Sequence, residues 1–437
     1  MRSEADLRSH FNVPKSQVLG RNDYGWLRVF MHKQLNADGF FRITAAELKE
    51  ISAREPRLMA KHDSTAARPW IFKELGLNII PVSRSEYLVG AFGLFTKFPD
   101  SESLGPIRYK PFPGNIESLD PNEITSESAA LNASALSEIL QDFLGTDTLQ
   151  ATVAGRMSTG SIDMSLACGN FQVTKAQMEI DAGLESSDQL CLVEAKNHLS
   201  DDFNIRQLYF PYRRFSQSLT KTVSPVYQVY SNGIFYLYRF DFEDDLRPES
   251  ITLVDSARYT LTPSNITLEV VKQLLKSTAM TAEPEGIPFP QADSFARVIN
   301  LCEQLQDAPL NVEEITENYD FTSRQTNYYT SAAKYLGLVE DSHRTWSLTD
   351  FGAKVMSSER NERNIALIKA LARHQVFHMV LIRALENAEV PDKNAIIDIM
   401  NASNLGLKDS TVTRRAGTVM SWAQWVWDVA TTQELEI

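Results

Sequence analysis

The chain has 437 residues, too many for one ordinary hydrophobic core, so its length predicts two or three domains. Hydrophobic residues make up 43% of it and charged residues 23%, as in globular proteins, and no apolar run is long enough to cross a bilayer. The formal net charge of −13 excludes a non-specific polycationic DNA coat, although it leaves room for a local basic groove. The N-terminus lacks the apolar core of a signal peptide, and three scattered cysteines predict neither disulfides nor a zinc site, so we expect a cytoplasmic protein.

Two segments rich in proline, glycine and serine divide the chain. Residues 99–125 and 278–292 lack sustained periodicity and contain several helix breakers, so we interpret them as linkers. They delimit three predicted domains: an N-terminal mixed α/β domain at 1–110, a middle domain at 120–277 and a C-terminal domain at 290–437.

The N-terminal domain carries no obvious chemistry, and DNA recognition is our hypothesis for it. Its segment 43–62 is typical of a helix interrupted at Pro56, and 78–92 is typical of short strands. The middle domain opens with a predicted helix at 134–145. Strand-like segments follow at 149–155, 160–167, 171–181 and 189–196. A helix at 201–221, broken near Pro211, and strands at 225–232 and 234–242 complete an order that predicts an α/β domain with a mixed sheet.

The C-terminal domain is predicted to be mainly helical. Helices are expected at 294–306, 311–319 and 322–341, the last ending at Gly337, followed by a short strand and a helix within 344–357. Three helices with a strand pair indicate the winged variant of the helix-turn-helix, and 361–429 supplies further helices. The expected fold class is therefore a multidomain α/β (α+β) protein with a mixed-sheet core and a helical, winged-helix C-terminal domain.

Acidic and basic side chains at the ends of two predicted strands form the strongest functional signal. Side chains two residues apart lie on the same side of a strand, so Glu179 shares a face with Asp181, and Glu194 with Lys196. The polar, glycine-containing segment 182–189 suits a hairpin, which would bring Asp181 near Glu194 and Lys196. Carboxylates are the ligands that Mg²⁺ prefers, and a neighbouring lysine can orient water and offset charge on a phosphate.

The pattern D-x(12)-E-x-K of Asp181, Glu194 and Lys196 resembles the PD-(D/E)xK nuclease superfamily, which includes most type II restriction endonucleases. The resemblance implies a mixed-sheet core, metal binding by Asp181 and Glu194, and a catalytic Lys196. Ile180 replaces the proline of the motif. In such nucleases an acid on the preceding helix sometimes joins the metal site, and Glu138 is the candidate here.

Further segments carry the same resemblance. Gln207 and Tyr212 are similar to a Gln-Tyr helix motif found in several branches of that superfamily. EPRLMAKHDS, EIDAGLE, VEAKNH and IPFPQA look like segments of bacterial restriction endonucleases.

Asp163, on the predicted strand 160–167, is the alternative first metal-binding acid. We favour Asp181 because its short spacing to Glu194 fits one hairpin, whereas Asp163 lies an extra strand away. A Glu-x-Lys pair alone is typical of an exposed strand. The apolar run 190–193 before Glu194 and the basic helix after it favour the nuclease interpretation.

Candidate DNA-binding residues fall into three groups. On the basic, aromatic helix after Lys196 they are Gln207, Arg213 and Arg214. In the winged helix, after an N-cap at Thr322 and Ser323, they are Arg324, Gln325, Asn327 and Arg344. Near the C-terminus they are Arg414 and Arg415, on a helix whose Trp422 and Trp425 we assign to the core. The alternatives are a solvated helix over buried aromatics and a winged helix that binds protein.

These features predict a type II restriction endonuclease that cuts double-stranded DNA with Mg²⁺. The chain has neither a P-loop nor a methyltransferase motif, so we expect the cognate methyltransferase to be encoded separately. A palindromic target would imply a homodimer. The alternatives are a non-catalytic winged-helix DNA-binding regulator and a repair or junction-resolving nuclease with the same site.

Overall fold

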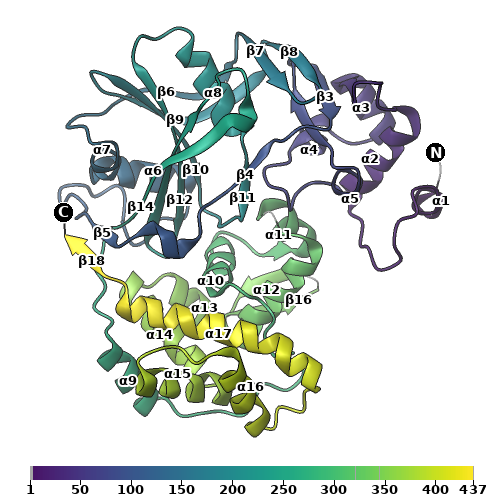
Figure 1. The fold of residues 1–437 in the computed structure, drawn as a ribbon. Coiled ribbons are helices and arrows are strands. Elements are labelled where there is room, and N and C mark those ends of the chain that lie inside the picture. Colours follow the sequence, from purple (N-terminus) through teal and green to yellow (C-terminus); the bar gives the residue numbers. More distant parts are fainter. Residues whose placement is uncertain (1–2, 320, 344, 437) are drawn as a thin grey trace.

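The computed structural model describes residues 3–319, 321–343 and 345–436 and has three parts: a small N-terminal α/β part, a large central sheet and a C-terminal layer of helices (Figure 1). This is the mixed α/β class expected from the sequence, with a mixed-sheet core and a helical C-terminal region. Among the described residues, no helix combines the length and apolar character that crossing a bilayer requires.

The N-terminal part packs short helices on a three-stranded sheet of order β1-β3-β2. Its elements are α1 (Glu4–His10), α2 (Arg21–His32), β1 (Phe40–Thr44), α3 (Ala45–Ser52), α4 (Pro56–Ala60), α5 (Trp70–Glu74), β2 (Asn78–Pro81) and β3 (Glu86–Gly90). The helix expected at 43–62 with an interruption at Pro56 is present as α3 and α4, but it starts later than expected because residues 43 and 44 belong to β1. Thr44 ends β1 and forms a capping box with Glu47 that starts α3, which ends at the left-handed Ala53. Pro56 then begins α4, at the position where its missing N–H costs nothing.

His62, directly after α4, is buried at 3% exposure and packs edge-on against Phe72. Burial lowers the pKa of His62 from about 6.5 to about 3. The positive charges of Arg68 and Lys73 also lower this pKa, whereas the negative charge of Asp63 opposes the shift. The unfolded chain therefore takes up a proton below about pH 6.5 that the folded chain refuses, so stability is present above that pH and is lost as the pH falls toward 3.

Below pH 6.5, we expect His62 to lower the free energy of unfolding of the wild-type protein by about 1.4 kcal/mol for each pH unit. His62→Leu should remove that part of the pH dependence. Chemical denaturation of both proteins at pH 7 and pH 5 measures it, and parallel losses in the two proteins would contradict the assignment.

The central sheet has eight strands in the order β18-β5-β14-β13-β12-β10-β9-β6. They are β5 (Ile107–Tyr109), β6 (Gln150–Ser158), β9 (Gln177–Glu185), β10 (Gln189–Lys196), β12 (Thr222–Ser231), β13 (Ile234–Phe242), β14 (Ile251–Thr260) and β18 (Glu434–Glu436). The pairs β10–β12, β14–β5 and β18–β5 are parallel and the others antiparallel. The single strand expected at 171–181 is two, β8 (Gly169–Thr174) and β9, because Lys175 between them takes a left-handed conformation with φ 51°.

Two small ladders and two 3₁₀ helices surround this sheet. The ladders are the hairpin of β7 (Ser161–Leu166) and β8 (Gly169–Thr174) and the pair of β4 (Phe95–Lys97) and β11 (Asp202–Asn204). The 3₁₀ helices are η1 (Ser101–Leu104) and η2 (Pro248–Ser250).

Helices cover both faces of the sheet, so β10 is buried on both sides. Leu190 and Leu192 pack toward α8 (Arg206–Ser216), whereas Cys191 and Val193 pack toward α6 (Glu127–Leu136) and α7 (Ile139–Leu144). A strand buried on both faces reads as a continuous apolar run, as 190–193 does.

Three expectations about these helices are wrong. The helix expected at 134–145 is two short helices, because Glu138 is left-handed with φ 58°. The helix expected from 201 begins at Arg206, because residues 202–204 pair with β4 instead. Pro211 lies within α8 and does not break it.

The C-terminal part begins as α10 (Phe295–Gln304), β15 (Leu310–Asn311), α11 (Val312–Asn318), α12 (Ser323–Tyr335), β16 (Val339–Ser342) and β17 (Thr345–Leu348). This order of helices and strands matches the winged helix-turn-helix expected from the sequence. Around it pack α9 (Leu268–Ser277), α13 (Asp350–Met356), α14 (Arg360–Ala372), α15 (Gln375–Asn387), α16 (Lys393–Ala402) and α17 (Asp409–Thr431). Trp422 of α17 is fully buried and Trp425 packs beside it, so the expected core role of both is confirmed.

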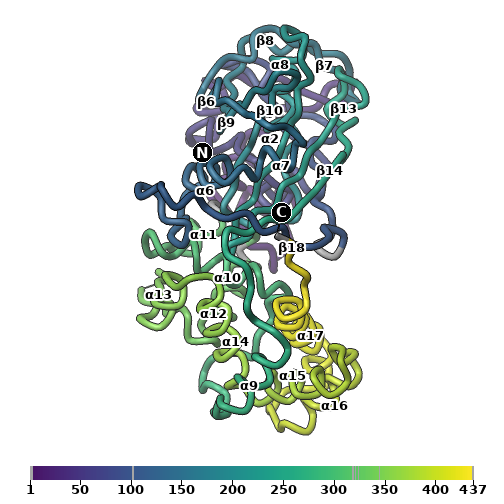
Figure 2. The backbone as a smooth tube through the Cα atoms, turned by 90° about the vertical axis from the view of Figure 1, so that its left-hand side faces the viewer, coloured from purple at the N-terminus to yellow at the C-terminus, as the bar shows by residue number. Residues whose placement is uncertain are grey.

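Both segments expected to be linkers pack against the domains. The first contributes η1 and β5, and the second buries Phe289 and Ala292, whose carbonyl accepts a hydrogen bond from Trp422 Nε1 at 2.8 Å. After α17 the chain returns to the sheet (Figure 2) and adds β18 beside β5 (Figure 1).

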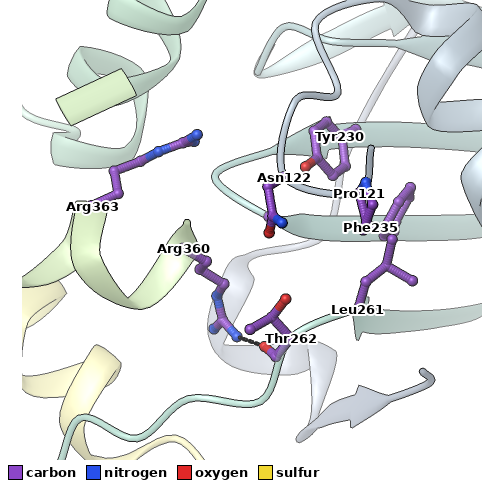
Figure 3. Close-up of a pocket in the computed structure, with 9 residues that line it drawn as sticks. Pro121, Asn122, Tyr230, Phe235, Leu261, Thr262, Arg360 and Arg363 are labelled. Carbon is purple, nitrogen blue, oxygen red and sulfur yellow. Dashed lines mark hydrogen bonds between the residues drawn. The ribbon is translucent and has the colours of Figure 1, made fainter. Parts of the chain in front are cut away.

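Arginine side chains close the seam between the sheet and the C-terminal helices (Figure 3). Arg360 donates to the carbonyl of Thr262 at 2.9 Å and pairs with Glu434 of β18 at 2.9 Å. The cavity in this seam has a volume of about 20 Å³, which leaves room for one water molecule. We therefore read it as a structural junction between the two parts.

Candidate active site

The hairpin expected between the two acidic strands is present. β9 and β10 pair antiparallel with Val193 opposite Ala182, so Asp181 and Glu194 are the next residues along the two strands. Asp181 Oδ2 accepts a hydrogen bond from the backbone N–H of Ala195 at 2.8 Å. This contact orients the Asp181 carboxylate toward the end of β10.

Lys196 and Glu194 form a nearly buried ion pair on the same face of β10. Lys196 Nζ lies 2.6 Å from Glu194 Oε1, with side-chain exposures of 13% and 11%. Gln207, from the first turn of α8, donates from Nε2 to the same Glu194 oxygen at 2.7 Å. Lys196 also donates to the carbonyl of Ala195 at 3.0 Å. The Glu194 carboxylate is thus held from two elements.

Burial and neighbouring carboxylates set the charges of this pair. Burial raises the pKa of Glu194 to about 7, although the charge of Lys196 opposes this rise. The negative charges of Asp181 and Asp63 raise the pKa further. Burial alone would lower the pKa of Lys196, but Glu194 and the neighbouring anionic groups hold it well above its usual value. Lys196 is therefore a protonated ammonium group. The clustered carboxylates around it form a site where a further cation would relieve repulsion.

The pair opens into a large cleft with a volume of about 860 Å³. The sheet side and α8 contribute the acids Glu127, Glu179, Asp181 and Glu194 with the cations Lys196 and Arg206. The N-terminal part contributes Arg57, Lys61, Asp63, Arg84 and Tyr87, and the C-terminal part contributes Gln304 and Tyr319. All three parts of the chain therefore meet at this cleft.

Helix α10 anchors the segment that follows Lys196. Asn300 Nδ2 and Gln304 Nε2 donate to the Asn197 carbonyl at 2.8 and 2.5 Å, and Asn300 Oδ1 accepts from the Leu199 N–H at 3.0 Å. Arg297, one turn earlier, pairs with Asp201 at 3.2 Å. These bonds join the C-terminal part directly to the end of β10.

The alternative first acid Asp163 and the additional helix acid Glu138 both lie elsewhere. Asp163 is exposed on the β7–β8 hairpin, where it accepts from Gln172 at 3.2 Å, and Glu138 is exposed at the break between α6 and α7. Neither lines the cleft. The helix acid at the site is Glu127, whose Oε1 lies 3.9 Å from Lys196 Nζ. We missed Glu127 because the helix was expected to start at 134; the signal for its true start is Ser126, which caps α6.

The candidates on α8 divide between cleft and core. Gln207 lines the cleft, but Arg213 is buried at 5% exposure and pairs with Asp245 at 3.2 Å. Tyr212 donates to the same carboxylate at 2.7 Å, so these two residues hold α8 onto the loop after β13. Arg214 is exposed and lies outside the cleft lining.

The candidates on α12 are arranged around its first turn. Thr322 is the N-cap as expected, and Gln325 completes a capping box, accepting from the Thr322 N–H at 2.9 Å. Arg324 and Asn327 are exposed, and Arg324 donates to the Tyr328 hydroxyl at 2.5 Å. The expected wing residue Arg344 lies outside the described residues.

The two arginines of α17 come close to this turn. Burial would raise the pKa of Tyr328, but the hydrogen bond and charge of Arg324, a hydrogen bond from Gln291 and the charge of Arg414 lower it, so both guanidinium groups lie near the phenol. Arg415 is 9% exposed, and within the described part of the chain its buried Nε and Nη1 have no hydrogen-bond partner. Tertiary packing thus gathers candidates from two distant segments into one basic cluster.

Comparisons with known proteins match three separate stretches of the chain. The family models are each described as a domain of unknown function: DUF6996 at 23–89, DUF6997 at 90–260 and DUF7226 at 297–431. No curated protein and no solved structure matches the chain. DUF6997 contains Asp181, Glu194, Lys196 and Gln207, whereas Arg57 and Asn300 fall in the other two models.

Proposed function

We propose that the chain is a Mg²⁺-dependent endonuclease that cuts double-stranded DNA, a type II restriction endonuclease of the PD-(D/E)xK superfamily acting in the cytoplasm. The observation that carries this proposal is the convergence of Asp181, Glu194 and Lys196 at one end of the β9–β10 hairpin, inside the cleft. A buried lysine–glutamate pair is costly as a purely structural device, because both charges lose their hydration.

The donor set of the site fits Mg²⁺. Among the residues that the structure describes, no three histidine, cysteine, aspartate or glutamate side chains form a group that could hold a metal alone. Mg²⁺ needs no such group, because it keeps several waters and is held by one or two carboxylates together with substrate phosphates. Asp181 and Glu194 would hold the ion, which supplies polarisation of a phosphoryl oxygen and activation of water.

The protein's own groups have distinct tasks in this proposal. Lys196, protonated and fixed by Glu194 and the Ala195 carbonyl, orients the attacking water and offsets the negative charge that develops on the phosphate. Gln207 keeps the Glu194 carboxylate in place, and the Ala195 N–H does the same for Asp181. Water attacks phosphorus and the bond to the 3′ oxygen breaks, which leaves 5′-phosphate and 3′-hydroxyl ends.

The basic cluster of Arg324, Arg414 and Arg415 supports DNA binding by the C-terminal part, and the absence of motor and methyltransferase motifs supports a stand-alone enzyme with a separate methyltransferase. A homodimer would match a palindromic target. The alternative of a non-catalytic regulator leaves the buried Lys196–Glu194 pair without a role.

Incubation of the purified protein with a sequenced supercoiled plasmid and Mg²⁺, followed by mapping of the ends, tests the proposal. We expect cuts at one short recurring sequence and none in EDTA. Absent cleavage would overturn the nuclease, random cleavage would overturn the restriction enzyme, and a preference for branched DNA would favour a junction-resolving enzyme.

A further inference from the structure

Charges in the cleft are segregated between its two sides. The side formed by the sheet, α6 and α8 carries the four acids Glu127, Glu179, Asp181 and Glu194 together with the cations Lys196 and Arg206. The N-terminal side carries Arg57, Lys61 and Arg84, here called the basic wall, with Asp63 as its one acid in the cleft lining. A substrate in this cleft would meet most of the carboxylates on one side and a mainly cationic surface on the other.

Most of the positive charge on the basic wall is uncompensated. Arg57 and Arg84 are exposed, and across the described ranges neither forms a hydrogen bond or an ion pair. Lys61 has Asp63 at 3.4 Å, an exposed contact of small energetic value. Unpaired guanidinium groups facing a concave surface are suited to phosphate oxygens.

The basic wall is fixed to the active-site framework. Asn204 of β11 donates from its backbone N–H to the Asp63 carbonyl at 2.8 Å and from Nδ2 to the His62 carbonyl at 2.7 Å. The Thr65 N–H donates to Asp202 at 2.8 Å. Because β11 directly precedes α8 and Gln207, the segment carrying Lys61 is held in register with the catalytic groups.

The turn that carries Arg84 is fixed as well. It joins β2 to β3, and the Val82 carbonyl accepts from the Thr174 N–H of the β7–β8 hairpin at 2.8 Å. Both cationic segments are thus attached to the central part of the protein before any ligand binds.

We infer that Arg57, Lys61 and Arg84 bind backbone phosphates of duplex DNA and hold the duplex against Asp181 and Glu194. The inference rests on the proposed function, because it names a part of the substrate-binding surface of that site. It assigns phosphate positioning to the N-terminal part, for which the sequence suggested DNA recognition without naming residues.

The test compares two double variants that remove the same charge. Arg57→Ala/Arg84→Ala removes two cations from the cleft, and Lys15→Ala/Lys49→Ala removes two exposed cations of the same part that do not line it. Binding of a fluorescently labelled duplex of mixed sequence is measured in EDTA over a series of salt concentrations, so that cleavage plays no part.

Each lost phosphate contact lowers the slope of log Kd against log salt by about 0.9. We expect the cleft variant to lose about 2 units of slope and at least about tenfold in affinity, and the control to keep wild-type values. Arg57→Lys/Arg84→Lys, which keeps the charges, should retain most of the slope and guards against misfolding as the cause.

A wild-type slope in the alanine cleft variant, or an equal loss in the control, would overturn the inference. The two proposals fail separately. A reduced slope in a protein that cuts no DNA would support the basic wall and overturn the nuclease. Normal DNA cleavage by the protein, together with an unchanged salt slope in the alanine cleft variant, would support the nuclease and overturn the role of the basic wall.

Discussion

Replacing Lys196 with methionine is expected to slow Mg²⁺-dependent DNA cleavage by about 100- to 1000-fold, the usual loss when one preorganised group that stabilises transition-state charge is removed. Methionine keeps the length of the side chain but removes the ammonium group that bonds Glu194 and the Ala195 carbonyl. Glu194→Gln and Asp181→Asn are expected to abolish detectable cleavage, since each removes a proposed metal-binding charge. Single-turnover cleavage of a supercoiled plasmid measures all three.

Matched controls come from the two acids that the fold keeps away from the cleft. Asp163→Asn and Glu138→Gln make the same kinds of change at exposed positions, so both should cut at the wild-type rate. Loss of activity in Asp163→Asn would reinstate the alternative first acid. A wild-type rate in Lys196→Met, with circular dichroism unchanged, would contradict the catalytic assignment of that residue.

Glu303→Ala is expected to lower the free energy of unfolding by about 3–5 kcal/mol, the range for breaking a buried ion pair from one side. The Glu303 carboxylate pairs with Arg363 at 2.9 Å, and their side chains are 14% and 8% exposed. It also accepts from the Ser231 hydroxyl at 2.7 Å and the Asn232 N–H at 2.8 Å. The variant would remove the acceptor of Arg363 Nη1 and of these two donors at the junction between the sheet and α10.

Chemical denaturation followed by far-UV circular dichroism measures this loss, with Glu269→Ala as the control. Glu269 has the same type of partner, Lys272 at 3.8 Å, but its side chain is 63% exposed. Exposed pairs contribute little, so the control should stay within about 0.5 kcal/mol of wild type. Equal effects of the two substitutions would contradict a buried role for Glu303.

Local patterns anticipated much of the β9–β10 hairpin. The apolar run 190–193 marked a strand buried on both faces, and period-two spacing put Glu194 and Lys196 on one side of it. Thr322 as a cap was also readable, because capping involves only a few neighbouring residues. Predictions failed where backbone conformation switched within a run, as at Lys175 and Glu138, both left-handed without a glycine to signal it.

The pairing of strands that are far apart in the sequence could not be predicted from such local patterns. β14 is mostly exposed over its first half, and β5 and β18 are three-residue strands, of which β5 pairs with β14 and β18 pairs with β5. Arg213 looked like a DNA contact because it is basic and flanked by aromatics, but its burial against Asp245 depends on how α8 packs.

The sequence by itself therefore determined the Asp181, Glu194 and Lys196 constellation, because strand periodicity and a short hairpin are local properties of the chain. Only the tertiary structure decided what surrounds it. Other segments of the chain supply Glu127, Gln207, the basic wall and the α10 anchor. The separation along the chain can exceed 100 residues, as it does for the hydrogen bond between Asn300 and Asn197. Their positions follow from packing free energy summed over the whole core, which no short window of sequence contains.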